Sequence, residues 1–169
     1  LKSYLDKLGL KTIGGHVDLE NTDEQLEFLP QLGSKYMICP GVHISSRDEA
    51  LKYAEVFNKN GERAQKVGLK YGYHNHNSDF DIYDGERVIE TLIKNTDPEL
   101  VTFELDVGWV CRAGLNAAEF IDINMDAPLR NAEASIHLYY GKQSFGRIET
   151  CYVGMMAVKR FGEKVKLYD

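Results

Sequence analysis

The sequence predicts an α/β fold built on a parallel sheet, and two observations carry that prediction. Short apolar runs of strand length alternate along the chain with longer segments of helical periodicity. No linker, low-complexity tract or internal repeat interrupts the alternation. Because strands that alternate with helices pair in parallel and are covered by those helices, we expect a single domain over residues 1–169.

The expected strands are six short apolar runs, of which the last is the weakest: KTIGGHV (11–17), KYMICP (35–40), LKYGYHN (69–75), VTFELDV (101–107), ASIHLYY (134–140) and KVKLYD (164–169). The expected helices lie between them: TDEQLEFLPQLG (22–33), SRDEALKYAEVFNKNGERAQKVG (46–68), DGERVIETLIKN (84–95), GLNAAEFIDIN (114–124) and MMAVKRFG (155–162). The second helix has the clearest start signal, because Ser46 is followed three residues later by Glu49.

Composition excludes several classes of protein. With 43% hydrophobic and 27% charged residues, the chain is typical of globular proteins rather than of disordered or fibrous ones. It has no apolar run long enough for a membrane span, and its first ten residues are amphipathic, so we expect a cytoplasmic protein. A formal charge of -6 argues against a nucleic-acid groove. Cys39, Cys111 and Cys151 are far apart and are expected to be core thiols.

Imidazole and carboxylate side chains collect at the ends of the expected strands. His16 ends the first run, His74 and His76 end the third, Asp106 lies near the end of the fourth, and His137 lies within the fifth. The carboxyl ends of parallel strands share one edge of a sheet, which is where such folds place their sites. We therefore expect these residues at one edge.

Each residue also has a purely structural interpretation. A single histidine at a strand end is commonly a hydrogen-bonded structural residue, and Asp106 is suited to cap the next helix. Trp109 and Arg112 fit simple packing and a surface salt bridge, and His43 lies in a loop farther from any strand end. Convergence from several strands favours a site, because imidazoles and a carboxylate are ligands for a divalent ion such as Mn, Co, Zn, Fe or Mg.

Two stretches carry a family resemblance: KYGYHNHNSDF (70–80) and PELVTFELDVGWVCRAG (98–114). At this spacing they resemble the sugar phosphate isomerase/epimerase group of the xylose-isomerase-like TIM barrels, which also contains inosose dehydratases and the endonuclease IV fold. The resemblance is good over residues 1–121 and weak beyond them. It implies a parallel β/α barrel and a metal-dependent enzyme that moves protons on carbons next to a sugar carbonyl.

The resemblance also assigns roles to individual residues. It places His74, Asp106 and His137 on the metal, with SIHLYYGK (135–142) in the position of the family's metal-binding histidine stretch. It implies that His76 binds substrate or moves its proton. Further residues are expected to line the sugar pocket: His16, Trp109 and Arg112.

The length of the chain modifies this expectation. A closed eight-stranded β/α barrel usually needs about 250 residues, whereas this chain has 169. We therefore expect a partial or truncated barrel of five or six strands. Because natural proteins cover or pair open sheet edges, the alternatives are a fragment of a longer protein or closure by a second copy of the chain.

Two classes of function follow. The first is a metal-dependent isomerase, epimerase or dehydratase that acts on a sugar, keto-sugar or cyclitol. The second is a catalytically reduced sugar-binding or assembly subunit with an incomplete metal site. The last expected strand favours the second class, because it ends without the glutamate that completes the family's metal shell. A DNA-repair role by analogy with endonuclease IV is disfavoured by the acidic charge.

Overall fold

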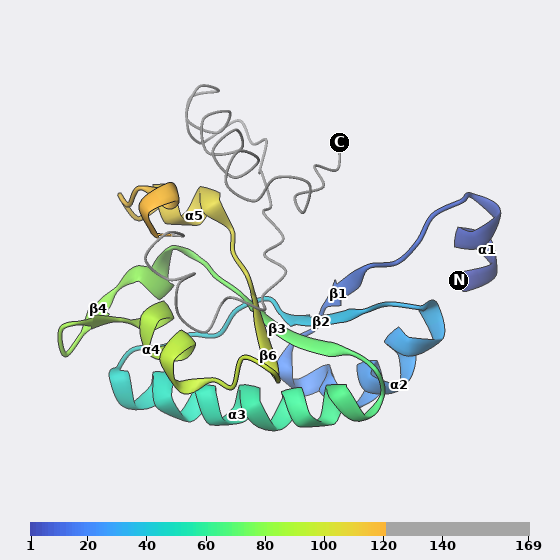
Figure 1. Ribbon diagram of the computed structural model, residues 1–169, viewed down its shortest axis with the longest axis horizontal. Helices are drawn as coiled ribbons and strands as arrows, with labels where there is room; N and C mark the ends of the chain where they lie inside the picture. The colour runs from blue at the N-terminus through green and yellow to red at the C-terminus, as the bar shows by residue number, and fades with distance from the viewer. Residues whose placement is uncertain (121–169) are drawn as a thin grey trace.

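The computed structural model describes residues 1–120, in which parallel strands form a sheet with helices packed against it (Figure 1). In chain order the elements are α1 (Lys2–Lys7), β1 (Gly14–His16), η1 (Leu19–Asn21), α2 (Thr22–Leu32), β2 (Tyr36–Cys39), α3 (Arg47–Lys66), β3 (Lys70–His74), η2 (Asn77–Phe80), β4 (Ile82–Tyr83), β5 (Glu86–Arg87), α4 (Val88–Asn95), β6 (Val101–Glu104) and α5 (Val107–Arg112). The sheet has the order β1-β2-β3-β6 and every pairing in it is parallel. The predicted α/β class is confirmed for the described residues.

The long helix α3 begins and ends where the sequence predicts. Ser46 is its N-cap, and the Ser46 Oγ accepts a hydrogen bond from the Glu49 N–H at 3.2 Å. The Glu49 carboxylate in turn accepts from the Ser45 N–H at 2.7 Å. The chain leaves the helix through Gly68, whose φ of 79° suits a residue without a side chain.

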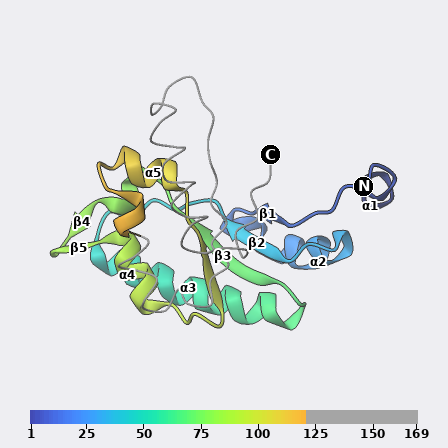
Figure 2. The same ribbon diagram turned by 45° about the horizontal axis from the view of Figure 1, so that its top comes forward.

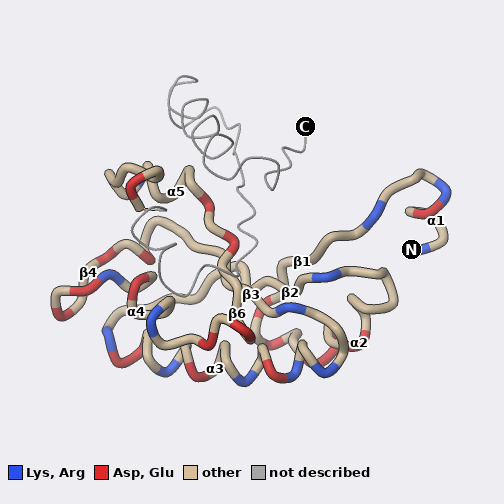
Figure 3. The backbone as a smooth tube through the Cα atoms, viewed as in Figure 1, with Lys and Arg blue, Asp and Glu red and all other residues tan. Residues whose placement is uncertain are grey.

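Helix α3 lies along one face of the sheet (Figure 2), and aromatic residues join the two. The ring of Phe57, fully buried on α3, stacks on Tyr73 of β3 at 5.0 Å and lies 5.9 Å from Tyr71. Charged residues follow α3 along the molecule, while the strands carry few of them (Figure 3). The helix therefore presents its apolar side to the sheet and its charged side to solvent.

The other face of the sheet is closely packed in its centre. Ile38 pairs with Gly72, and Gly72 pairs with Thr102 on the next strand. A Cβ atom on Gly72 would lie 2.5 Å from Ile38 Cδ1 and 2.9 Å from Thr102 Cγ2. Glycine is required there because its neighbours already fill the space.

A hairpin that the sequence did not predict precedes α4. The segment 84–95 was expected to be helical throughout, but α4 begins only at Val88. Before it, β4 and β5 pair antiparallel across Asp84 and Gly85, whose φ values are 53° and 82°. Two central residues with positive φ make the type I′ turn that Asp-Gly favours.

Several expectations fall outside the described residues: the strands over 134–140 and 164–169, the helix over 155–162, and His137. The helix expected over 114–124 is described only from Ala117 to Phe120. At the other end of the chain, α1 contains no buried residue and projects from the body (Figures 1 and 2). Within residues 1–120, no helix is both long enough and apolar enough to cross a membrane.

Candidate functional site

Three strands of the sheet end in a residue that can bind a metal ion. His16 is the last residue of β1, His74 of β3 and Glu104 of β6. His74 and Glu104 are directly paired in the parallel register of β3 and β6. The strand ends therefore bring two imidazoles and a carboxylate to the carboxyl edge of the sheet.

These three side chains, which we call the strand-end cluster, are in direct contact. Glu104 Oε2 lies 2.6 Å from His16 Nε2 and 3.0 Å from His74 Nδ1. The two imidazole rings are 4.9 Å apart, and one ligand atom from each residue lies within 4.8 Å of the others. Which ring nitrogen donates to the carboxylate depends on the tautomer of each imidazole, and a ring nitrogen that carries no hydrogen is free to bind a metal ion.

Burial differs across the cluster. The side chain of His74 is 3% exposed and that of Glu104 is 10% exposed, whereas that of His16 is 41% exposed. A charged carboxylate at such depth requires partners, and both imidazoles supply them. His16 therefore forms the solvent side of the cluster, and His74 forms its floor.

Asp106 lies on the far side of His74 from Glu104. Its Oδ1 accepts hydrogen bonds from the N–H groups of Gly108 and Trp109 at 2.8 and 3.2 Å, so this oxygen caps α5. Its Oδ2 lies 3.8 Å from His74 Nε2 and has no hydrogen-bond partner in the part of the chain that the structure describes. The helix-cap interpretation is thus correct for one oxygen, while the other is directed at the cluster.

Asn75 connects the two strand ends that carry these groups. Its Oδ1 accepts from the Asp106 N–H at 2.8 Å, and its Nδ2 donates to the Asp106 carbonyl at 3.2 Å. These two hydrogen bonds hold Asp106 at a fixed position relative to His74.

His76 lies beyond the end of β3, which stops at His74, so the expected extension of the strand to residue 75 is wrong. Its ring is nevertheless 5.0 Å from the His74 ring and 5.5 Å from Trp109. Burial, and then the neighbouring His74, lower the pKa of His76 from its ordinary value. Arg112 is exposed and its guanidinium lies 5.9 Å from the Trp109 ring centre, a cation–π arrangement.

The structure therefore groups the predicted residues differently from the sequence. His16, expected in the sugar pocket, lies in the strand-end cluster, and Asp106, expected as a ligand, lies beside that cluster. His43 is exposed and is not a member of the cluster.

Glu104 was missed by sequence reasoning. Its signal was an acid inside the apolar run VTFELDV, two residues before Asp106 and so on the same side of an extended chain.

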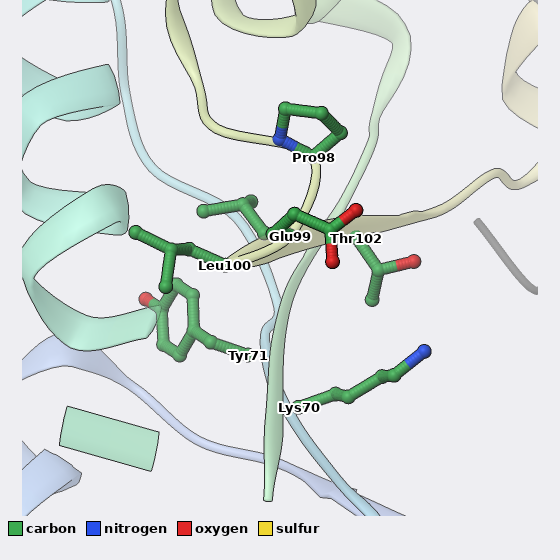
Figure 4. Close-up of a pocket in the computed structure, with 7 residues that line it drawn as sticks. Lys70, Tyr71, Pro98, Glu99, Leu100 and Thr102 are labelled. Carbon is green, nitrogen blue, oxygen red and sulfur yellow. The ribbon is translucent and has the colours of Figure 1, made fainter. Parts of the chain in front are cut away.

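A small pocket at the opposite end of the sheet is separate from this cluster (Figure 4). It lies at the amino ends of β3 and β6 and is lined by Lys70, Tyr71, Pro98, Glu99, Leu100, Val101 and Thr102. Its lining contains no histidine, and the carboxyl edge remains the place where imidazoles and acids meet.

Comparison with known proteins identifies the fold. No family model matches the sequence, and no curated protein matches it. Among solved structures, a sugar phosphate isomerase/epimerase from Parabacteroides distasonis is 24% identical with a TM-score of 0.67, and the match covers 98% of this chain and 76% of that one. The 3-keto-D-glucoside 4-epimerase of E. coli is 13% identical with a TM-score of 0.57, over 93% of this chain and 82% of that one.

A third similar structure is a fusion protein of a xylose isomerase-like TIM barrel with a 4-hydroxyphenylpyruvate dioxygenase. It is 11% identical with a TM-score of 0.53, and the match covers 98% of this chain and 38% of that one. Likeness at these identities establishes fold and leaves activity open. The chain has the xylose-isomerase-like TIM-barrel fold, as the motifs had predicted.

Proposed function

We propose that this protein is a metal-dependent isomerase, epimerase or dehydratase that removes a proton next to the carbonyl of a sugar, keto-sugar or cyclitol. The observation that carries the proposal is the strand-end cluster of His16, His74 and Glu104 at the carboxyl edge of the sheet. The similarity to structures of sugar isomerases and epimerases supports the substrate class.

The residues present fit a divalent ion. Two imidazoles and a carboxylate are a ligand set for Mn, Co, Zn or Fe, while Mg prefers oxygen ligands throughout. The buried Asp106 Oδ2 gives independent support, because it has no hydrogen-bond partner among the described residues. An unpaired buried carboxylate oxygen is costly, and a cation nearby would offset that cost.

The neighbouring residues would bind and orient the substrate. Trp109 offers an apolar ring face for a sugar, and Arg112, 5.9 Å from that ring, offers several N–H donors for sugar oxygens. His76, between Trp109 and His74, would transfer the proton at the substrate carbon. A bound metal ion would act as a Lewis acid that polarises adjacent substrate oxygens.

A second candidate is a sugar-binding or assembly subunit without catalytic activity. It is favoured by the direct contacts of Glu104 with both histidines, at 2.6 and 3.0 Å, because these groups satisfy one another without a metal. The two candidates differ in whether the cluster binds a metal ion and in whether substrate protons exchange.

Metal binding is tested first, on the full chain stripped with a chelator and titrated with Co²⁺ by calorimetry. We expect the unchanged chain to bind Co²⁺, and His74→Ala and Glu104→Gln to lose that binding. His43→Ala is the matched control, because it removes an exposed imidazole that is not a member of the cluster. Full Co²⁺ binding by His74→Ala and Glu104→Gln would contradict the proposed site.

Proton abstraction is tested in D₂O with Co²⁺-loaded protein and a panel of ketohexoses and scyllo-inosose. NMR should detect deuterium at the carbon next to the carbonyl. His76→Ala should retain Co²⁺ and lower the exchange rate by about 10²–10⁴-fold, the usual contribution of a general acid or base. Sugar binding without Co²⁺ binding and without exchange would establish the second candidate instead.

A further inference from the structure

A buried acid lies close to the candidate site but outside the strand-end cluster. Asp79, in η2, is 2% exposed, and no lysine or arginine pairs with it among the described residues. Burying a carboxylate without a cation is unfavourable, so its position requires an explanation. The proposed reaction does not use Asp79 directly.

The hydrogen bonds of Asp79 lead to the turn that carries His76. Asp79 Oδ2 accepts from the His76 N–H at 2.6 Å, and the Asp79 N–H donates to the His76 carbonyl at 3.2 Å. Asp79 Oδ1 accepts from the Tyr73 hydroxyl at 2.9 Å. The Asp79 carboxylate thus joins the side chain of Tyr73, on β3, to the backbone of His76.

The same network reaches the loop that follows β2. The Tyr73 hydroxyl, besides donating to Asp79, lies against the backbone of Val42, whose N–H favours the ionised form of that hydroxyl. The loop containing Val42 also approaches the His76 ring, because a Cβ atom on Gly41 would lie 3.0 Å from His76 Nδ1 and 3.2 Å from its Cε1. Asp79 and Tyr73 therefore connect the two segments that enclose one side of this ring.

Two other rings of the candidate site lie close to the His76 ring. The His74 ring is 5.0 Å away at an interplanar angle of 77°, and the Trp109 ring is 5.5 Å away at 44°. The ring is held by contacts on its faces, so its position depends on how firmly the surrounding backbone is fixed.

We propose that Asp79 is a positioning residue that holds the His76 imidazole against Trp109 by tying the His76 turn, through the Tyr73 hydroxyl, to the loop at Gly41 and Val42. This proposal rests on the proposed function only for the catalytic meaning of His76. The geometric part stands on Asp79, Tyr73 and their partners. It predicts that the His76 ring shifts when the hydrogen bonds of Asp79 or the Tyr73 hydroxyl are removed, even in a chain that remains folded.

The test measures the ring position directly by NMR on the full chain without metal or sugar. Nuclear Overhauser contacts from His76 Hε1 to the Gly41 Hα protons and to the Trp109 ring report the position of the His76 ring. Contacts between the His16 and His74 rings, which are 4.9 Å apart, report the strand-end cluster in the same sample. Asp79→Asn keeps the size of the side chain but leaves a single acceptor oxygen for two donors.

We expect Asp79→Asn to lose the His76 contacts to Gly41 and Trp109 and to keep those between His16 and His74. The matched control is Asp81→Asn, an exposed acid two residues along that undergoes the same change of charge. It should keep all of the contacts. Unchanged His76 contacts in folded Asp79→Asn would overturn the proposal.

Tyr73→Phe provides a second, independent test of this connection. It removes the hydroxyl that lies between Asp79 and Val42 and keeps the ring that packs on Phe57. It should also lose the contact of His76 with Gly41. The double variant Tyr73→Phe/Asp79→Asn should show no further loss, since residues that act as one unit are not additive. If Asp79→Asn does not fold, the result for Tyr73→Phe tests the proposal. An intact contact between His76 and Gly41 in that variant would contradict the positioning role of Asp79.

The outcome can be separated from that of the proposed function. Failure of the strand-end cluster to bind Co²⁺ removes the metal-dependent reaction but leaves the ring contacts of His76 measurable. Intact Co²⁺ binding with unchanged ring contacts in Asp79→Asn removes the positioning role alone. In an active enzyme, Asp79→Asn should lower kcat at unchanged Co²⁺ affinity, and Asp81→Asn should leave both unchanged.

Discussion

Tyr73 and His74 are neighbours on β3, yet they face opposite sides of the sheet and have different surroundings. Tyr73 packs against Phe57 of α3 at 5.0 Å, among apolar and aromatic side chains. His74 faces the other side, where it contacts Glu104 at 3.0 Å and lies 3.8 Å from Asp106. Both residues are buried, so burial by itself does not distinguish core from site.

The difference lies in what each face needs in order to be stable. The face that packs against α3 is stabilised by apolar contact and by close packing. The opposite face, at its carboxyl edge, buries charge that only specific partners make tolerable. Substitutions on the first face should therefore change stability, and those on the second should change ligand binding.

The largest effect is expected for Phe57→Ala on the side of α3. Removing a fully buried ring that touches Tyr71 and Tyr73 should lower the free energy of unfolding by about 3–5 kcal/mol. Urea denaturation measures this change. Lys59→Ala, exposed on the same helix, should change it little, and a small effect of Phe57→Ala would mean that this face is not the principal core.

The buried carboxyl of Asp79 should make stability depend on pH. Burial raises the pKa of Asp79 from its ordinary value of 3.8 to about 6. Between these values the folded state keeps a proton that the unfolded state has released, so stability is highest below pH 4 and is lost as the pH rises through 6. A shift of this size corresponds to about 3 kcal/mol.

Asp79→Asn cannot titrate, so it isolates this contribution. The stability of the unchanged chain relative to Asp79→Asn should fall by that amount between pH 4 and pH 7 in urea denaturation. Asp81→Asn serves as the control, and its curve should run parallel to that of the unchanged chain. An equal pH dependence for all three proteins would show that Asp79 titrates normally.

Gly72→Ala should cost about 1–3 kcal/mol, the usual penalty for overpacking. The new Cβ atom would lie 2.5 Å from Ile38 Cδ1. Ile38→Val removes that Cδ1 atom, so the cost of Gly72→Ala should be smaller in an Ile38→Val background. If denaturation with urea gave the same cost for Gly72→Ala in both backgrounds, the sheet would be accommodating the new Cβ atom without a shift of Ile38 Cδ1.

The smallest effect on stability is expected for His16→Ala, at less than about 1 kcal/mol, because His16 is the exposed partner of Glu104 and the His74 imidazole remains in contact with that carboxylate. The side chain of His16 is 41% exposed and its contact with Glu104 is the outermost of the cluster. Calorimetry should nevertheless record a loss of Co²⁺ binding. If His16→Ala unfolded, or if it bound Co²⁺ normally, His16 would not follow the expected difference between the two faces of the sheet.

The sequence predicted the four strands of the parallel sheet and the helices α2 and α3, because their signals are local. Ser46 with Glu49 marked the start of α3, and Gly68 marked its end. The hairpin was missed although Asp84-Gly85 is a strong turn signal, since its two strands have only two residues each and the helix pattern of 88–95 follows at once. Short strands leave too few residues for a period to be recognised.

The site was only partly predictable, for a different reason. The positions of His16 and His74 at strand ends correctly predicted that both lie at one edge of the sheet. They could not show which carboxylate lies between the two imidazoles. That depends on the register of β3 with β6, which pairs His74 with Glu104 and leaves Asp106 to cap α5. Register between parallel strands joined by a long crossover is a tertiary property that no single segment encodes.

The pairing of His74 with Glu104 also determines where the chain can change in length during evolution. A deletion within β6 would bring Leu105 to the position opposite His74, because side chains alternate at every residue of a strand. An insertion between α4 and β6, at the other end of the sheet, would leave this pairing intact, and the entropy of a longer loop rises slowly. Relatives that keep the strand-end cluster should therefore have a constant number of residues from Val101 to Asp106 and differ in length between Asn95 and Val101.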